Sequence, residues 1–350
     1  MSSVHQDIAA YEAWLRKQCD VVEDDLEAKH ERMLEGPFAF LRATYFRWAR
    51  RIEAACPELG DAPKAASVGD IHVENFGTWR DADARLVWGI NDFDEAAVMP
   101  YAYDLVRLTT SARLVPHLTL DARSVATAIV RGYRKGLAEP RAVLLDEFEH
   151  WMRPFADGDK NANREFWSEV AKYPDASPPA VVRRALKKTL PEGAEVVRFA
   201  SRRKGGGSLG RPRFLAIAKW NSGSALREAK ALVPSAWDWA HAGKGRGSRF
   251  IELAYGPHRS PDPILAIKGD YIVRRVAPDA RKIEIKDIER QGLSTRLLTA
   301  MGADLGAVHA ADERSKAILA DLESRKRGWL HRAADAAEAM TLRDYHALAG

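Results

Sequence analysis

Apolar residues in the first part of the chain recur every three or four positions, which is the spacing of one face of a helix. Between residues 5 and 56 these positions are Ile8, Tyr11, Leu15, Phe38, Phe40, Leu41, Phe46 and Trp48. Pro57 and Pro63 interrupt the pattern, and a loop is expected after them. The helical spacing returns in residues 104–114 and again after Asp121, whose side chain is suited to cap a helix. The first part of the chain is therefore predicted to be mainly helical.

From Val196 onward the pattern changes to short apolar or alternating runs, which indicate β-strands. These runs occupy residues 214–218, 225–232, 264–267 and 271–276. Gly269–Asp270 separates the last two runs and predicts a tight hairpin turn. One earlier strand is expected at residues 85–90, where five apolar or small residues precede a group of carboxylates. A small sheet is therefore predicted late in the chain.

Two further segments complete the expected order of elements. Ser294 is expected to begin a long helix, and its apolar face would carry Leu297, Leu298, Met301, Leu305 and Val308. Residues 154–180 are polar and contain Pro174, Pro178 and Pro179, so we expect a lid or linker there. A helical part is thus followed by a small sheet and then by helices again.

Composition narrows the class of protein. The 350 residues are 46% hydrophobic and 29% charged, as in an ordinary soluble globular protein long enough for two lobes. No apolar run approaches the ~20 residues that span a bilayer, and the N-terminus does not resemble a signal peptide, so we expect a cytoplasmic protein without a membrane partner. Cys19 and Cys56 lack the spacing of a metal or disulfide framework. The net charge of +5 comes without a nucleic-acid-binding motif, so no nucleic-acid partner is expected.

The first motif with chemical content is GDIHVEN at residues 69–75. Phosphoryl transfer needs a carboxylate within reach of the attacking hydroxyl and a neutral oxygen ligand for Mg²⁺. Asp70 and Asn75 supply both from one short loop, so Asp70 is the candidate catalytic residue and Asn75 a candidate metal ligand. His72 is expected to hold the loop by a hydrogen bond rather than to bind metal. The alternative is an ordinary turn, in which glycine, Asp and Asn are common.

The second motif is INDFDEA at residues 90–96, directly after the predicted strand. Asp92, Asp94 and Glu95 would repel one another unless a cation or a basic partner compensates their charges. Asp92 is the first candidate for a Mg²⁺ ligand. Asp94 is either a second metal ligand or a partner that fixes the loop. An exposed acidic turn is the alternative interpretation.

The third motif is GGGSLG, in which Gly205, Gly207 and Gly210 match the pattern G-x-G-x-x-G, with Ser208 between them. A dinucleotide-binding fold would place a helix after these glycines, whereas β-type residues follow them here. That context favours a glycine-rich hairpin over the phosphates of ATP. A flexible hairpin without a ligand is the alternative.

Such a lobe also needs a cation on a later strand to contact the α- and β-phosphates. Counting from Gly210, the usual spacing reaches Arg227, and Lys230 is the nearest lysine. Lys230 is preferred because it shares a strand face with Glu228. Glu252, in a helix expected around residues 249–253, either pairs with this lysine or faces solvent.

Together these residues resemble a known family. The blocks that carry the resemblance are GPFAFLRATYFRW (36–48), GDIHVENFG (69–77), INDFDEA (90–96), YAYDLVRLTTSA (101–112), GGGSLG, REAKALVPSA and YIVRR. They resemble the bacterial family of unknown function DUF2252, which is similar in turn to the protein kinase-like superfamily and its aminoglycoside and choline kinase branch. The resemblance implies a catalytic Asp70, the Mg²⁺ ligands Asn75 and Asp92, and a structural Asp104. Arg227 stands where that family more often has lysine.

The order of the motifs departs from that of kinases, because the glycine-rich segment follows the catalytic loop. We therefore expect an α+β, two-lobed, kinase-like fold that is circularly permuted. Residues 1–195 would form a helical catalytic lobe, residues 196–283 a small β-rich nucleotide-binding lobe, and residues 284–350 helices that return to the first lobe. The helix that ends in LGAVHA (305–310) resembles the one that ordinarily precedes the catalytic loop.

The function expected from these features is ATP- and Mg²⁺-dependent phosphotransfer to a hydroxyl on a small molecule or protein that the sequence does not identify. Two alternatives stay open: a kinase-like protein that binds nucleotide or a partner without turnover, and an enzyme that transfers AMP. A metallophosphatase is disfavoured because the chain lacks the further GDxxD and GNH motifs. The oligomeric state is not predicted.

Overall fold

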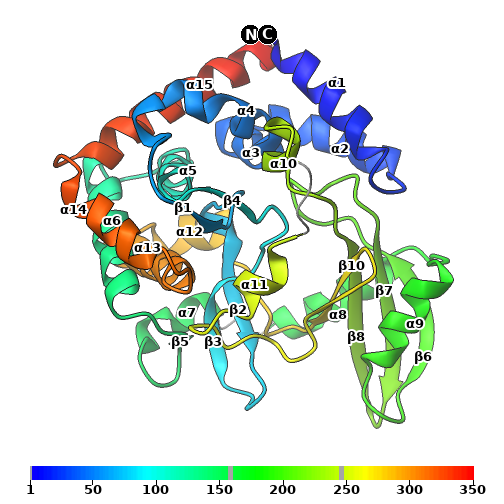
Figure 1. The fold of residues 1–350 in the computed structure, drawn as a ribbon. Helices are drawn as coiled ribbons and strands as arrows, with labels where there is room; N and C mark the ends of the chain where they lie inside the picture. Colours follow the sequence, from blue (N-terminus) through cyan, green and yellow to red (C-terminus); the bar gives the residue numbers. More distant parts are fainter. Residues whose placement is uncertain (1, 157–160, 244–247) are drawn as a thin grey trace.

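The computed structural model describes residues 2–156, 161–243 and 248–350. In these residues most helices gather on one side of the molecule and the largest sheet lies on the other (Figure 1). This mixed architecture agrees with the predicted α+β class. The kinase-like arrangement, its permutation and the domain boundaries remain predictions.

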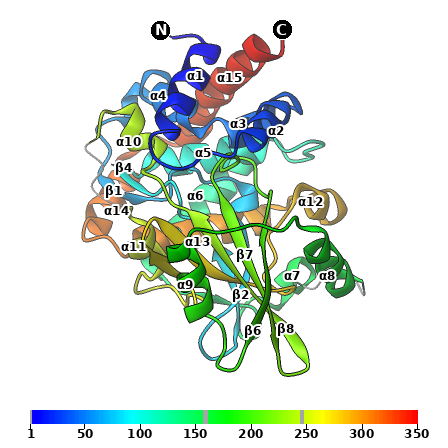
Figure 2. The ribbon, with the colours of Figure 1, turned by 90° about the vertical axis from the view of Figure 1, so that its right-hand side faces the viewer.

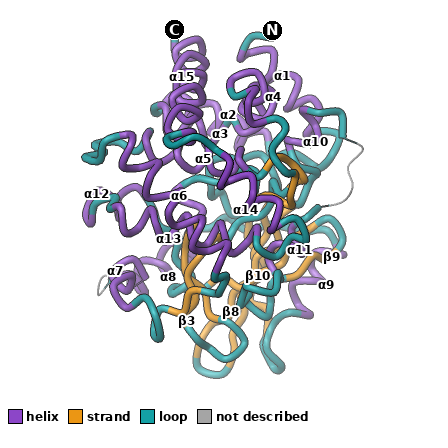
Figure 3. Tube along the Cα trace, turned by 60° about the vertical axis from the view of Figure 1, so that its left-hand side comes forward, coloured by secondary structure: helices purple, strands orange, loops and turns teal. Residues whose placement is uncertain are grey.

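The N-terminal segment is helical, as predicted, but it forms four short helices. They are α1 (Val4–Leu15), α2 (Glu23–Leu34), α3 (Pro37–Ala43) and α4 (Tyr45–Ala55). The chain turns before α3 because Gly36 has a φ of +146° and Pro37 begins the helix. Arg47 on α4 donates to Asp7 on α1 and to Asp344 on α15 (Trp329–Ala349). The first and last helices therefore lie at the same end of the molecule (Figure 3).

The helical part is centred on three further helices. They are α5 (Ala102–Arg113), α6 (Ala122–Ala138) and α13 (Thr295–His309). Asp121 and Ser294 cap α6 and α13, as the sequence predicts. The two helices approach so closely that a side-chain carbon at Gly136 would lie 1.8 Å from the carbonyl oxygen of Ala303. This glycine crossing fixes the end of α13, where His309 lies.

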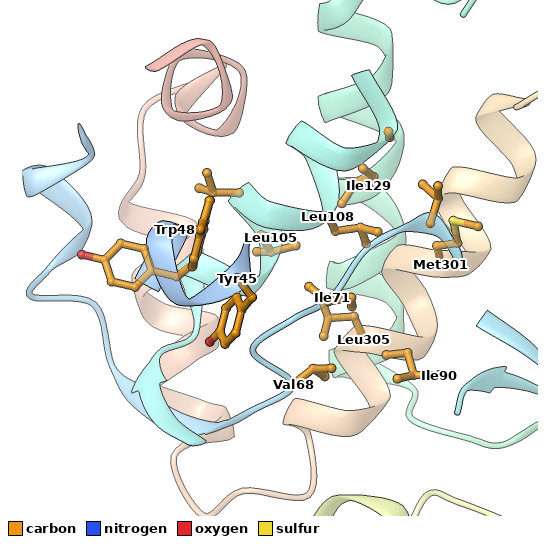
Figure 4. Close-up of a cluster of buried hydrophobic side chains, with 14 of the residues drawn as sticks. Tyr45, Trp48, Val68, Ile71, Ile90, Leu105, Leu108, Ile129, Met301 and Leu305 are labelled. Carbon is orange, nitrogen blue, oxygen red and sulfur yellow. The ribbon is translucent and has the colours of Figure 1, made fainter. Parts of the chain in front are cut away.

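A single hydrophobic core joins these helices to the loop that carries Asp70 (Figure 4). Its buried members include Tyr45, Trp48, Val68, Ile71, Ile90, Leu105, Leu108, Ile129, Met301 and Leu305. Val68 and Ile71 flank Asp70 on both sides in sequence, and both are fully buried. The core therefore holds the backbone of Asp70 in place.

Two small sheets accompany the helical part. One pairs β1 (Lys64–Ser67) with β4 (Ala97–Pro100), and the other contains β2 (Phe76–Arg80), β3 (Leu86–Ile90) and β5 (Val143–Leu144). The strand predicted at residues 85–90 corresponds to β3. In the β2–β3 ladder Phe76 faces Ile90, and the N–H of Asn91 donates to the carbonyl of Asn75 at 3.0 Å. The ends of the first two motifs are thus adjacent.

The largest sheet is antiparallel throughout, in the order β6–β7–β8–β10–β9. Its strands are β6 (Glu195–Ser201), β7 (Arg213–Trp220), β8 (Gly223–Ala231), β9 (Ala266–Lys268) and β10 (Tyr271–Val276). The hairpin predicted at Gly269–Asp270 joins β9 to β10. Helix α9 (Ala180–Lys188) covers one face of this sheet with Val182 and Leu186 (Figure 2). The other face is directed toward the helical part.

The lid or linker predicted at residues 154–180 is only partly right. Residues 162–172 form helix α8, in which the buried Val170 packs inward, and residues 157–160 lie outside the described part of the chain. Val170 is the buried residue of Ala162–Lys172, so the helix shows little apolar periodicity in the sequence. The other helices are α7 (Arg153–Ala156), α10 (Ala236–Ala240), α11 (Phe250–Ala254), α12 (Ile285–Gln291) and α14 (Ser315–Ser324). None of the helices described combines the length and apolar character of a membrane span.

Candidate active site

The loop at residues 69–75 is positioned by Asp104 on α5. The backbone N–H groups of Val68 and Gly69 donate to its carboxylate at 2.7 and 2.9 Å. His309, at the end of α13, lies with Nε2 3.2 Å from the same carboxylate. These contacts agree with the structural role that the resemblance implies for Asp104. Within the loop, His72 Nδ1 accepts from the N–H of Glu74 at 3.2 Å, which is the loop-holding role predicted for it.

Asp70 is largely enclosed by cationic and backbone groups. Arg107, which is fully buried on α5, donates through Nε to Oδ1 of Asp70 at 3.1 Å and forms a second contact through Nη2. Burial raises the pKa of Asp70 to about 6, and the attraction of Arg107 opposes that rise only in part. The other carboxylate oxygen is covered by Gly207, because a side-chain carbon at that glycine would lie 3.0 Å from Oδ2.

Asn75 is buried, and its Oδ1 atom has no hydrogen-bond donor among the described residues. A buried oxygen without a hydrogen-bond donor is rare in a protein interior unless it contacts water or an ion. Its backbone is paired with Asn91, so Asp92 follows immediately beside it. Among the described residues no group of three or more His, Cys, Asp or Glu side chains is arranged to hold a metal. Asn75 and Asp92, one amide and one carboxylate, nevertheless fit an oxygen-ligated cation that also takes ligands from phosphate.

Asp92 is held between two lysines from other parts of the chain. Lys282 Nζ lies 3.0 Å from Oδ2, and Lys230 Nζ lies 3.8 Å from Oδ1. Burial alone would raise the pKa of Asp92, but the two ammonium groups outweigh it and hold that pKa well below the usual range. Burial lowers the pKa of Lys230 to about 8, against the attraction of Asp92.

The carboxylates of Asp94 and Glu95 contact basic partners. Asp94 forms an ion pair with Lys230 and lies 3.8 Å from Nη1 of Arg211. Arg211 is buried and also pairs with Glu95, whose second oxygen accepts from the N–H of Ala236 at 2.6 Å. In these contacts Asp94 fixes the loop, which is one of the two roles that the sequence allows; its role as a metal ligand stays a prediction.

The glycine loop (Gly205–Gly210) connects β6 to β7, so it lies in a hairpin as predicted. Gly205 and Gly210 have φ values of +95° and +91°, which side chains disfavour. Ser208 Oγ accepts from Arg213 at 2.7 Å, and Gly207 rests on the backbone of Arg42 as well as on Asp70. The glycine loop and the loop at residues 69–75, distant in sequence, are therefore in direct contact.

The two candidates for the phosphate contact lie on opposite faces of β8. Lys230 is directed toward the loop of residues 92–95, which we call the acidic loop. Arg227 instead donates to the carbonyl of Thr189 at 2.7 Å on the face that α9 covers. The structure therefore does not bring Arg227 together with the other candidates. Glu252 forms an ion pair with Arg249 on its own helix and has no contact with Lys230.

Three buried or partly buried cations of this site, Arg107, Lys282 and Arg211, could not be predicted from the sequence motifs. Arg107 had a weak signal, because it is a charged residue inside an otherwise apolar helix pattern. Lys282 and Arg211 had none, since each reaches the acidic loop only through the tertiary fold. Lys282 is brought there because residues 281–283 run beside β2, with Lys282 opposite Gly77.

Comparison with known proteins found a family match for only part of the chain that forms this site. No curated protein and no solved structure matches the chain. The matched family segment ends before the glycine loop and the large sheet, so the resemblance of those later segments remains a prediction. Residues 21–149, which contain Asp70, Asn75, Asp92 and Arg107, match the model of a family described as an uncharacterized protein conserved in bacteria, DUF2252.

Proposed function

We propose that this protein is a kinase-like phosphotransferase that uses ATP and Mg²⁺ and acts on a hydroxyl-bearing acceptor. The observation that carries the proposal is the meeting of the three motifs at one place. The glycine loop touches Asp70, while Lys230 on the following hairpin contacts Asp92 and Asp94. Kinase-like phosphoryl transfer needs this combination of a phosphate-covering loop, a base, a metal-binding pair and a cation.

Each residue has a defined task in this proposal. Asn75 and Asp92 would hold Mg²⁺, which neutralises charge on the phosphates when it is bound. Asp70, with its raised pKa, would accept the proton of the acceptor hydroxyl. Lys230 would contact the phosphates, and the glycine loop would cover them. Arg107 would orient Asp70 through its two contacts with Oδ1.

Thermal melting with and without ATP and Mg²⁺ tests the nucleotide site. We expect ATP with Mg²⁺ to raise the melting temperature of the natural chain and to have little effect on the Asp92→Asn variant. Asp121→Asn, which alters an exposed carboxylate at the start of α6, is the matched control and should respond like the natural chain. Absence of any shift in the natural chain would remove ATP from the proposal.

A second candidate is nucleotide binding without phosphoryl transfer, or transfer of AMP. It is favoured by the enclosure of Asp70, because Arg107 occupies one carboxylate oxygen and Gly207 covers the other. Mass spectrometry of the protein and of a metabolite pool after incubation with ATP separates the cases. Phosphorylated products support the first candidate, adenylylated products support AMP transfer, and unchanged ATP in a binding-competent protein supports the inactive one.

A further inference from the structure

Three arginines surround one buried glutamate on the face of the large sheet that is turned toward the acidic loop. Glu228 is fully buried, and it accepts from Arg202 at 2.9 Å, from Arg213 at 3.3 Å and from Arg274 at 2.8 Å. We call Arg202, Arg213 and Arg274 the arginine cluster. Arg202 and Arg213 are themselves buried, and Arg274 is partly exposed.

The strand register places the arginine cluster beside the proposed phosphate contact. Arg213 on β7 is directly opposite Lys230 on β8, and Arg274 on β10 is directly opposite Glu228. Residues opposite each other in a ladder project from the same face of the sheet. The cluster, Lys230 and the acidic loop therefore belong to one electrostatic environment.

Positive charge exceeds negative charge in this environment. The cations are Arg202, Arg213, Lys230, Arg274 and Lys282, and the carboxylates that they contact are Asp92, Asp94 and Glu228. Arg211 and Glu95 pair with each other and leave this balance unchanged. Five cations thus face three carboxylates among the described residues, so this group has a net charge of +2 although every cation contacts a carboxylate.

The guanidinium groups also have hydrogen-bond donors to spare. Each has five N–H bonds, and one carboxylate cannot accept from all of them. Among the described residues, Nη2 of Arg202, Nε of Arg213 and Nη1 of Arg274 donate to no protein atom. Arg213 uses a further nitrogen to hold Ser208 of the glycine loop. The guanidinium of Arg213, with its unused Nε, therefore lies next to the segment expected to cover phosphates.

Clustered, buried and like-charged groups destabilise a fold unless an anion compensates them. Their effect is seen at Arg213, whose pKa is lowered by burial and by the neighbouring Arg274 and Arg202, although Glu228 opposes the shift. Arginine is the side chain that best matches the oxygen atoms of a phosphate group through paired donors. A phosphate chain would supply both the missing charge and the missing acceptors.

We propose that the arginine cluster is an oligophosphate-binding site that takes the phosphate chain of a nucleoside triphosphate. The inference rests on the proposed function for the identity of the nucleotide, but the affinity for an oligophosphate follows from the cluster itself. A magnesium-bound nucleoside triphosphate carries a net charge of about −2, which matches the net charge of +2 in this environment. Arg274 and Arg213 would donate to the oxygen atoms of the phosphate chain.

Isothermal titration calorimetry with tripolyphosphate, and separately with MgATP, tests this assignment on the full chain. The test variant is Arg274→Met. The matched control is Arg275→Met, on the same strand but the opposite face, where Arg275 pairs with Asp262. We expect Arg274→Met to weaken tripolyphosphate binding at least about tenfold and Arg275→Met to change it less than about twofold.

Stability distinguishes a binding role from a structural one. Removing one of three crowded cations should leave the melting temperature of the unliganded Arg274→Met variant equal to or above that of the natural chain. A lower melting temperature together with unchanged tripolyphosphate and MgATP affinities would assign Arg274 a structural role and overturn the proposal. Should Arg274→Met not fold, Arg274→Lys keeps the charge without the paired donors, and unchanged binding in that variant would also overturn it.

The two ligands separate this inference from the proposed function. Binding of tripolyphosphate that depends on Arg274, with no binding of MgATP, would support the arginine cluster and remove the ATP-dependent function. Equal binding of MgATP to the natural chain and to both Arg274 variants would leave the function in place and remove the cluster from it.

Discussion

Two ionisable side chains, Asp70 and Lys29, have pKa values displaced by burial. Asp70 has its pKa raised to about 6, and Lys29 on α2 has its pKa lowered to about 8. In both cases burial disfavours the charged form. The consequences differ, because the charge on Asp70 is part of the proposed chemistry, whereas Lys29 has no ion pair among the described residues and contacts the rings of Tyr11 and Phe46.

For Asp70 the expected consequence is a pH-dependent rate. The ionised carboxylate is the form that accepts a proton, so phosphoryl transfer should fall as the pH drops through about 6. Asp70→Asn should lower the rate by about 10²–10⁴-fold while nucleotide binding is retained. Initial rates and nucleotide affinity, both measured from pH 5 to 8, check this. A rate independent of pH over that range, or full turnover by Asp70→Asn, would contradict the assignment.

For Lys29 the expected consequence is a cost in stability. Its pKa in the folded chain, about 8, lies below the ordinary 10.5, so the unfolded chain binds the proton more tightly. Stability from this group should therefore rise between about pH 8 and 10.5. Lys29→Met should raise the free energy of unfolding by about 2 kcal/mol at pH 7, with a smaller gain at pH 9.5. Urea denaturation at both pH values checks this, with the exposed Lys17→Met as control; a less stable Lys29→Met at pH 7 would contradict it.

At the scale of elements, local signals determined what could be predicted from the sequence. Helix caps and apolar spacing identify α6, α13 and β10 in the sequence. These signals come from residues that are close together in the chain. Strands β1, β2 and β4 went unrecognised, since they have only four or five residues each, and β1 pairs with β4, which lies beyond β2 and β3 in sequence. The same distinction applies to the site. Asp70, Asn75 and Asp92 lie in short motifs, whereas Arg107, Lys282 and the arginine cluster converge only through tertiary structure.

The glycine loop offers a test of close packing at this scale. A side-chain carbon at Gly207 would lie 2.8 Å from the carbonyl oxygen of Arg42, a backbone atom that cannot easily move. Gly207→Ala should therefore displace the loop from Asp70 and cost about 1–2 kcal/mol of stability. Gly206→Ala is the matched control, since its added carbon would meet only the guanidinium of Arg42 at 3.6 Å.

Hydrogen exchange at residues 203–210 and chemical denaturation report the two effects. We expect faster exchange and lower stability for Gly207→Ala and a change below about 0.5 kcal/mol for Gly206→Ala. Equal behaviour of the two variants would mean that the loop does not rest on the catalytic loop in solution.

At the scale of the whole molecule, ion pairs join the large sheet to the helical part. Arg211, which lies just before β7, forms the most enclosed of these contacts, with only 2% of its side chain exposed. It pairs with Glu95 in the acidic loop and donates to the hydroxyl of Tyr11 on α1 at 3.3 Å. Glu95 also receives the N–H of Ala236 at 2.6 Å. Segments from three regions of the chain therefore meet at this pair.

Replacing only one residue of such a buried ion pair should lower the stability of the fold more than replacing both residues. Arg211→Met leaves the Glu95 carboxylate buried without its cation, so we expect a loss of about 3–5 kcal/mol. Arg203→Met is the control, because Arg203 pairs with Asp25 across the same boundary but is 54% exposed, and its loss should cost less than about 1 kcal/mol.

Adding Glu95→Gln to Arg211→Met removes the stranded charge, so the double variant should be more stable than the sum of the single losses predicts. Chemical denaturation of the four chains of this cycle measures the coupling; additive losses, or equal costs for Arg211→Met and Arg203→Met, would show that the buried pair does not hold the two parts together.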